Sequence, residues 1–194
     1  MSLQQSKIKT MRGLQTTLRR SLCALTSATL LLSTVQAQEV QTVGTVDLQR
    51  YAGTWYEIAK FPNRFQKKCI ANTRADYAAQ EDGRISVLNQ CKVAGGVVDQ
   101  VNGVARIVDT KTNARLKVRF APAWLSWLPF VWGDYWIIGL TPDYSVATVG
   151  SPDRDYLWIL SRTKSLSTAA YDAAVDKATR QGFDTSKLEK SVQE

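Results

Sequence analysis

The stretch GTWYEIAKF, residues 53–61, is rich in aromatic and β-branched residues and opens with a glycine, which predicts a β-strand. Large side chains alternate onto both of its faces, with Trp55 on one face and Tyr56 on the other. A glycine at the start of a strand allows another part of the chain to approach the backbone closely. A strand occupied on both faces is expected where a sheet folds over on itself.

Outward from this strand, the chain continues as short alternating segments separated by turn residues. Turns are indicated at residues 81–83, 95–96, 141–143 and 151–155. The clearest half-solvated strand is residues 114–120, where apolar and basic residues alternate. Besides residues 53–61, the predicted strands are residues 73–79, 85–90, 97–108, 114–120, 134–140, 146–150 and 156–160.

One amphipathic helix is expected after the last strand. Ser167 is its predicted N-cap, Gly182 lies where it should end, and apolar residues recur between them at helical spacing. Eight sequential strands with one apolar face can hide that face by rolling into an up-and-down barrel, which also removes the sheet edges. The expected fold class is all-β: an eight-stranded antiparallel up-and-down β-barrel with one C-terminal α-helix packed outside.

The interior of such a barrel is either filled by side chains or holds one small ligand. Alternation places small, aromatic and a few polar residues on the inner face, which suits an apolar cup with polar groups for a ligand. Each polar group is either a head-group contact or a satisfied core group. The predicted ligand-binding residues are Ala75, Tyr77, Val87, Asn89, Val101, Ala105, Leu116, Val118, Phe120, Tyr135, Ile137, Tyr156 and Trp158.

The first 37 residues have the pattern of a secretory signal peptide. Arg19 and Arg20 precede an apolar run, residues 22–32, and the small-residue site at 35–37 follows. The alternatives are a membrane anchor, for which the run is short, and lipid attachment at Cys23, which Leu22 precedes in place of a small residue. We expect export, cleavage after Ala37, a flexible tail over residues 38–45 and one domain over residues 46–190.

The charge balance argues against nucleic-acid binding. The formal net charge is +8, but the leader holds five basic residues and no acid, leaving 20 basic and 17 acidic residues beyond it, a net of +3. No basic stripe remains to follow a phosphate backbone.

Two cysteines remain after export, Cys69 and Cys91. In an oxidising compartment an even pair favours a disulfide, the alternative being two buried thiols. The chain has no histidine and the two cysteines lack metal-ligand spacing, so no metal or other cofactor is expected.

Three short motifs resemble the signatures of the lipocalin family. Residues 53–56, GTWY, resemble the first signature, residues 141–144, TPDY, the second, and Arg162 the arginine of the third. The similarity extends over residues 46–188, and the segment 152–163 is similar to bacterial lipocalins related to apolipoprotein D.

The resemblance implies that Gly53, Trp55 and Arg162 belong to the closed end of the barrel, where a guanidinium over an indole face is stabilising. It also implies a carrier of small hydrophobic molecules, with fatty acids or lysophospholipids in the bacterial envelope as the expected ligands, and not an enzyme. The alternatives are a lipocalin-type enzyme, a tetrapyrrole carrier without a histidine ligand for iron, and a purely structural envelope protein with a filled barrel. We expect a monomer or homodimer, exported to the periplasm and associated with the outer membrane or free of it.

The segment APAWLSWLPFVWG, residues 121–133, is the most apolar connection between two predicted strands. Exposed apolar patches mark membranes, ligands or partners, and tryptophan suits a membrane interface. The hypothesis is a rim that makes peripheral contact with a bilayer; a hydrophobic lid over the mouth and a dimer contact are the alternatives. The residues concerned are Trp124, Trp127, Leu128, Phe130 and Trp132.

Overall fold

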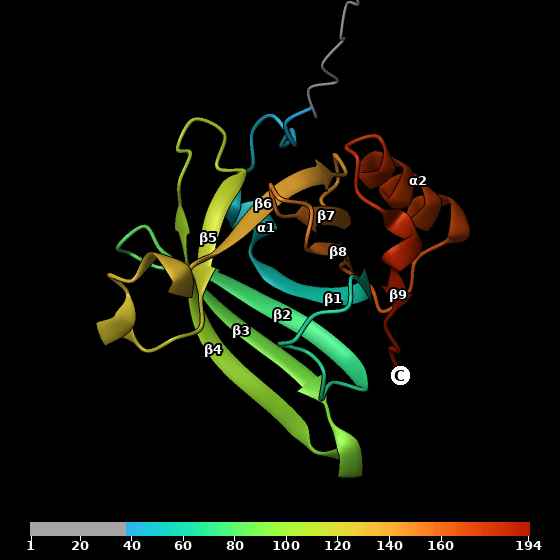
Figure 1. The fold of residues 1–194 in the computed structure, drawn as a ribbon, viewed down its shortest axis with the longest axis horizontal. Helices are drawn as coiled ribbons and strands as arrows, with labels where there is room; N and C mark the ends of the chain where they lie inside the picture. The colour runs from blue at the N-terminus through green and yellow to red at the C-terminus, as the bar shows by residue number, and fades with distance from the viewer. Residues whose placement is uncertain (1–37) are drawn as a thin grey trace, which may run out of the picture. The chain divides into compact units, whose positions relative to one another are not determined.

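The computed structural model describes residues 38–194, so the predicted signal peptide lies outside the described residues. Eight antiparallel strands form a closed barrel, which confirms the predicted fold class (Figure 1). The barrel strands are β1 (Gly53–Lys60), β2 (Ala71–Ala79), β3 (Ile85–Lys92), β4 (Val98–Ile107), β5 (Arg115–Arg119), β6 (Gly133–Leu140), β7 (Val146–Gly150) and β8 (Leu157–Ser161). The other elements are α1 (Leu48–Tyr51), α2 (Thr168–Thr179), the short strand β9 (Glu189–Lys190) and 3₁₀ turns at Ala94–Gly96, Ala123–Leu125, Pro129–Val131 and Thr185–Lys187.

Each strand pairs with its neighbour in sequence, and β1 closes the barrel by pairing with both β8 and β2. A bulge between Glu57 and Ala59 shifts the register of β1 against β8. Beyond it, β1 pairs with β9 in place of β2. The chain end completes this seam: the Ser191 amide donates to the Ile58 carbonyl (2.9 Å), and the Asn72 amide to the Val192 carbonyl (2.8 Å).

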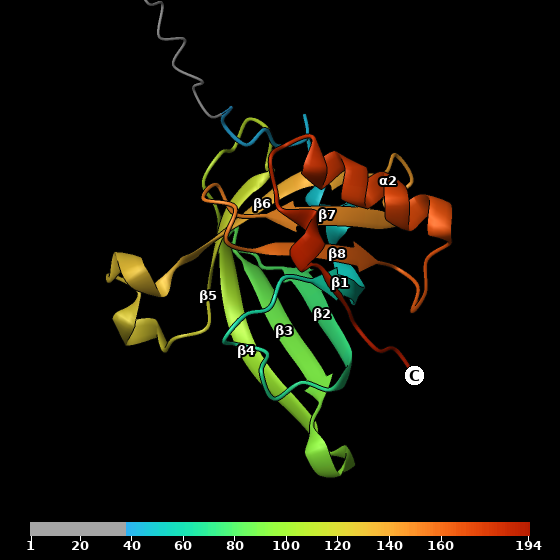
Figure 2. The same ribbon diagram turned by 45° about the vertical axis from the view of Figure 1, so that its right-hand side comes forward.

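Because the strands alternate in direction, their connections gather at two ends. The end at which β1 begins, predicted to be the closed end, carries α1 and the connections at 80–84, 108–114 and 141–145. The mouth end carries the connections at 61–70, 93–97, 120–132 and 151–156. The connection at 120–132 projects away from the barrel on the side opposite α2 (Figures 1 and 2).

Helix α2 lies outside the barrel against β6, β7 and β8, as predicted (Figure 2). The Ser167 side chain caps it by accepting from the Ala170 amide, and Gly182 follows it with a φ of +80°. Its buried residues are Ala174 and Ala178, whose small side chains let the helix approach the sheet.

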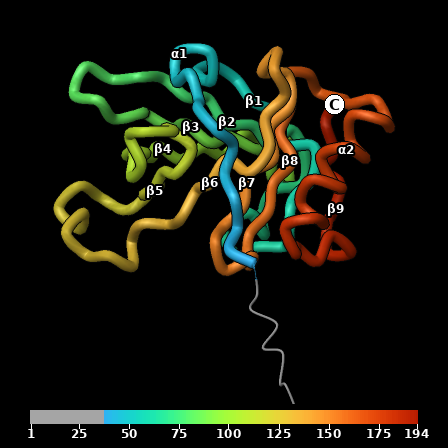
Figure 3. Tube along the Cα trace, turned by 90° about the horizontal axis from the view of Figure 1, so that it is seen from above, coloured from blue at the N-terminus to red at the C-terminus, as the bar shows by residue number. Residues whose placement is uncertain are grey.

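Residues 38–45, expected as a flexible tail, lie on the barrel instead (Figure 3). Val40 is buried in the outer cluster with Ile138 and Phe183, and the Val43 amide donates to the Ile137 carbonyl (2.9 Å). The prediction was wrong because it followed the polar residues and gave no weight to the two valines.

Candidate functional site

Trp55 and Arg162 meet at the closed end of the barrel. The indole of Trp55 is fully buried and its Nε1 donates to the Tyr51 carbonyl (2.8 Å). The guanidinium carbon of Arg162 lies 3.9 Å from the centre of the Trp55 ring. Gly53 has a φ of +94°, and a Cβ there would lie 3.3 Å from Nη1 of Arg162, so glycine makes room for this side chain. The geometry is that of a sealed end and not of a ligand site.

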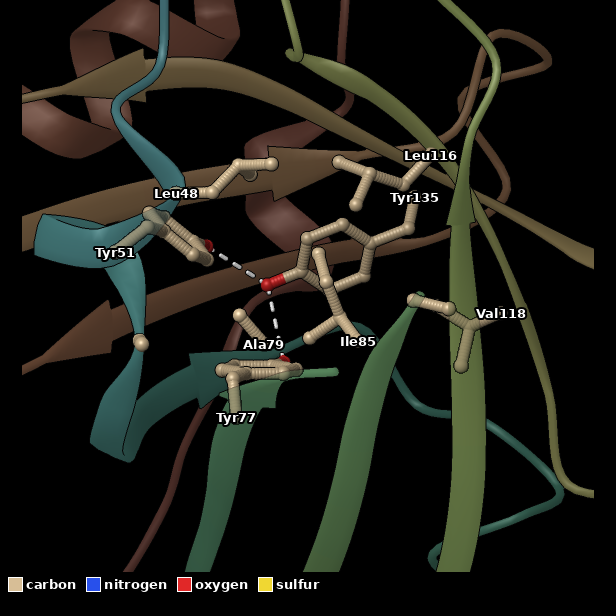
Figure 4. Close-up of a pocket in the computed structure, with 10 residues that line it drawn as sticks. Leu48, Tyr51, Tyr77, Ala79, Ile85, Leu116, Val118 and Tyr135 are labelled. Carbon is tan, nitrogen blue, oxygen red and sulfur yellow. Dashed lines mark hydrogen bonds between the residues drawn. The ribbon is translucent and has the colours of Figure 1, made fainter. Parts of the chain in front are cut away.

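Three tyrosine hydroxyls converge just inside this end. The Tyr135 hydroxyl lies between those of Tyr51 (2.8 Å) and Tyr77 (3.0 Å), as Figure 4 shows. Burial raises the pKa of all three phenols, that of Tyr77 to about 12, so they are neutral. They form a polar layer at the base of the barrel interior, in which the hydroxyls are hydrogen-bonded to one another.

The half of the barrel nearer the closed end is filled by its own side chains. The cavity beside the tyrosines is lined by apolar groups that include Leu48, Ile85 and Leu116, and its volume is about 10 Å³ (Figure 4). That is room for about one water molecule and not for a hydrocarbon chain. The expectation of an apolar cup is therefore restricted to the mouth half of the interior.

Toward the mouth, inward-facing residues remain accessible. The strand register places Ala75, Asn89 and Val101 side by side on the inner face. Val101 is nevertheless 43% exposed and Phe120 41% exposed. Phe120 lies directly over Gly103, where a Cβ would come within 2.6 Å of its ring. The Oδ1 atom of Asn89 is buried beside them without a hydrogen-bond partner.

An aromatic stack leads from the mouth into the barrel. Trp158 faces inward against the core, and Tyr156 stacks on it with ring centres 5.8 Å apart and an interplanar angle of 6°. Phe65, from the connection between β1 and β2, continues the series at 5.9 Å from Tyr156. These flat surfaces suit contact with an apolar chain or ring.

A buried carboxyl, Glu57, lies on the inner face of β1, two residues beyond Trp55. It accepts from Ser191 Oγ (2.6 Å) and from Gln66 Nε2 (2.5 Å). Burial raises the pKa of Glu57, which these two hydrogen bonds and Lys60 partly offset. Gln66 also accepts from Trp158 Nε1 (3.2 Å), so one glutamine joins the carboxyl, the tryptophan and the mouth loop.

The predicted disulfide is present. Cys69 and Cys91 are bonded across 22 residues of sequence, with their Cα atoms 5.5 Å apart. The bridge ties the connection at 61–70 to the end of β3. Next to it, the Ile70 amide donates to the Lys92 carbonyl (2.8 Å). The disulfide and this hydrogen bond together hold the connection against β3 at the mouth.

The apolar connection at 120–132 does not form a lid. Trp124, Trp127 and Phe130 are 74–80% exposed. Trp132 instead lies on the outer face of β4 and β5, with its ring centre 4.3 Å from the guanidinium carbon of Arg106 and 5.2 Å from that of Arg119. The exposed tryptophans are therefore carried outward, and Leu128 is half-buried among them.

Most of the predicted inward-facing residues do meet in the barrel core. The buried or packed members are Ala75, Tyr77, Val87, Ala105, Leu116, Val118, Tyr135, Ile137 and Trp158, while Asn89, Val101, Phe120 and Tyr156 lie toward the mouth. Sequence reasoning missed Tyr51, Glu57 and Gln66. The alternation with Trp55 marks Glu57 as inward-facing, but no sequence pattern brings Gln66 to it.

Over residues 38–194 there is no group of three or more histidine, cysteine, aspartate or glutamate residues placed to hold a metal ion. No helix in the same range is long and apolar enough to cross a membrane.

Comparison with known proteins agrees with this geometry. Residues 46–193 match the model of the lipocalin-like domain. Temperature-induced lipocalin-1 of Arabidopsis thaliana is 44% identical over 160 residues, which cover 81% of this chain and 85% of the relative. Outer membrane lipoprotein Blc of Escherichia coli K12 is 41% identical over 150 residues, which cover 77% of this chain and 80% of the relative. The structure of insecticyanin from the tobacco hornworm Manduca sexta superposes with a TM-score of 0.62 at 23% identity, covering 80% of this chain and 85% of that one, which is a likeness of fold. The motifs, the barrel and these relatives together establish that the chain belongs to the lipocalin family.

Proposed function

We propose that this lipocalin binds and carries single-chain amphiphiles, fatty acids or lysophospholipids, in the bacterial cell envelope. Lipocalins are generally binding and transport proteins for small hydrophobic ligands, and the E. coli relative is named an outer membrane lipoprotein. The observation that carries the proposal is the accessible inner face: Val101 lies on it, Phe120 lies over Gly103 on the same face, and both are still more than two-fifths exposed.

The energetics of the mouth half permit such binding. Each methylene removed from water contributes ~0.8 kcal/mol. Ordering a ligand costs at least ~4 kcal/mol. An acyl chain that buries about ten methylenes against the aromatic stack and the inner face therefore gains at most about 4 kcal/mol net, a millimolar affinity, and contacts of the head group have to supply any tighter binding.

The mouth also offers a surface for a bilayer. Most of the large apolar residues that are exposed in the described chain lie at this end, the exceptions being Val108 and Val192. Those at the mouth are Phe65, Ile70, Val97, Val98, Val101, Phe120, Trp124, Trp127 and Phe130, so the apolar rim extends beyond the connection at 120–132. A rim of this composition around a ligand entrance supports peripheral membrane contact, through which a lipid would enter without crossing water.

Native mass spectrometry of the protein purified from its own envelope tests the carrier function. We expect a co-purifying species with the mass of a fatty acid or lysophospholipid, released by organic solvent. A preparation that holds no acyl species and that also fails to take up added palmitate would overturn the proposal. Fractionation of the same cells tests the proposed periplasmic location, with the protein expected in the periplasmic or outer-membrane fraction.

A further inference from the structure

A groove beneath the connection at 61–70 lies beside the barrel mouth and outside the predicted ligand residues. Its volume is about 400 Å³, within the usual range of ligand sites. It is lined by Lys60, Pro62, Asn63, Arg64, Gln66, Lys67, Cys69 and Glu189. We infer that this groove binds the anionic head group, a carboxylate or a phosphate, of the ligand whose chain occupies the barrel. The inference rests on the proposed function and names where the head group is held.

The groove carries an excess of positive charge. Its lining contains three cations, Lys60, Arg64 and Lys67, against one carboxylate, Glu189. Lys60 forms a salt bridge with Glu189 (3.0 Å), and its side chain is only 16% exposed. Within the described chain neither Arg64 nor Lys67 has a salt bridge to a carboxylate, whereas the neighbouring Lys68 pairs with Asp99 (2.6 Å). Two cations therefore remain to meet an anion.

Gln66 connects the groove to the barrel interior. It lines the groove, and its side chain reaches the inward-facing Trp158 and the buried Glu57. The register of β1 against β8 pairs Lys60 with Trp158, so both lie on the same face of the sheet. An acyl chain lying on Trp158 thus brings its polar end to Gln66 and the cations beyond it.

The connection at 61–70 is held in place before a ligand binds. Oδ1 of Asn63 accepts from the amides of Phe65 and Gln66, both at 3.1 Å. The Cys69 amide donates to the Gln66 carbonyl (2.9 Å), and the disulfide fixes Cys69 to β3. A site that is already ordered loses less free energy to conformational entropy on binding.

The nearby carboxyl does not oppose this assignment. Glu57 touches Gln66 from the interior side, and burial raises its pKa, which favours the uncharged form next to an anion. Arginine and lysine pair with both carboxylate and phosphate, and arginine can bind either through two parallel hydrogen bonds. The chemistry shared by a fatty acid and a lysophosphatidic acid is therefore what the groove recognises.

Three ligands with the same sixteen-carbon acyl chain separate the head group from the chain: palmitate, 1-palmitoyl lysophosphatidic acid and neutral 1-monopalmitoylglycerol. Their affinities for the disulfide-bonded protein are to be measured by titration calorimetry below the micellar concentration. We expect both anionic ligands to bind about tenfold more tightly than the neutral one, since two partly exposed charge pairs are each worth up to about 1 kcal/mol. The anion with the larger preference identifies the head group that fits better.

The double variant Arg64→Gln and Lys67→Gln should remove this preference while leaving monopalmitoylglycerol binding unchanged. Lys111→Gln, in the exposed turn at the closed end, is the matched control and should keep the preference. Equal affinities of the wild type for all three ligands, or a double variant that keeps the preference, would overturn the head-group site alone. If none of the three ligands binds, the carrier function and the head-group site fail together.

Discussion

Arg162 lies across Trp55, with 3.9 Å between the guanidinium carbon and the centre of the indole ring, although the two residues are more than 100 positions apart in sequence. The same guanidinium donates to the backbone carbonyls of Arg50 (2.7 Å), Tyr51 (3.1 Å) and Thr54 (2.9 Å). One side chain thus joins the end of β8, the α1 turn and the start of β1. The two motif residues are explained by closure of the barrel and not by ligand contact.

Arg162→Lys should therefore destabilise the fold while keeping the charge. A lysine ammonium has no planar fork, so it cannot cover the indole and reach three carbonyls at once. We expect a loss of about 2–3 kcal/mol in the free energy of unfolding, measured with urea. Arg84→Lys, in the exposed β2–β3 turn, is the matched control with an expected change below about 0.5 kcal/mol. Equal stability of the two variants would contradict the closing role.

The disulfide should contribute through the loop that it closes. Replacing both Cys69 and Cys91 by serine removes a cross-link across 22 residues, for which about 3 kcal/mol of destabilisation is expected. Urea unfolding of the double variant and of the reduced wild type should agree. The intact mass of the wild type should rise by about 2 Da on reduction, and a constant mass would show free thiols in the isolated protein.

Alternation along strands was enough to predict the barrel and most of its interior. It placed Ala75, Val87 and Leu116 correctly, because one residue in two must face the core once a sheet is closed. It could not predict that Tyr51 would fill the closed end, since a single helical turn is too short to show a repeating pattern of apolar residues. The links from Gln66 to Glu57 and Trp158 join distant segments through side chains, which no local pattern encodes.

The same limit applies to the depth of the cavity. Pattern alone assigned Tyr77, Tyr135 and Val101 equally to a ligand site. The structure separates them, because the hydroxyls of the two tyrosines are hydrogen-bonded to each other near the closed end, while Val101 remains accessible near the mouth. Side-chain volume and rotamer decide this difference, and neither follows from a two-residue period.

Val101→Trp should block ligand binding without affecting the fold. The larger side chain would project from the inner face into the open half of the barrel, where Val101 is 43% exposed. We expect at least a tenfold loss of affinity for palmitate, with a change below about 0.5 kcal/mol in unfolding free energy. Val108→Trp, at an exposed position of the closed end, is the control and should bind palmitate like the wild type. Unchanged affinity of the Val101 variant would place the ligand elsewhere.

Trp124→Ser combined with Trp127→Ser should weaken binding to liposomes. Full burial of a large apolar side chain is worth roughly 1.5–3 kcal/mol, so even half-burial of two indoles gives at least a tenfold change in partitioning. Flotation with phosphatidylethanolamine and phosphatidylglycerol vesicles measures it, with Val108→Ser as the control. Partitioning like that of the wild type would remove the connection at 120–132 from the membrane contact and leave a partner protein or a second copy as its occupant.

Glu57→Gln should change how stability depends on pH. Because burial raises the pKa of Glu57 above its ordinary value of 4.5, the folded protein holds this proton more tightly than the unfolded chain. The resulting stabilisation is fully present below pH 4.5 and is lost as the pH rises through the folded pKa. Glutamine does not titrate, so the stability of the wild type relative to the variant should fall across this window and then level off.

Ser191→Ala provides the second arm of this experiment. The Ser191 hydroxyl donates to Glu57 and lowers its pKa, so removing the hydroxyl should extend the fall to higher pH. Urea unfolding between pH 4 and pH 8 measures all three proteins, and taking differences cancels the groups that they share. If the difference in unfolding free energy between wild type and Glu57→Gln stays constant or rises over this range, Glu57 is charged in the folded protein. Its contacts with Gln66, Ser191 and Lys60 would then offset the desolvation of the carboxylate.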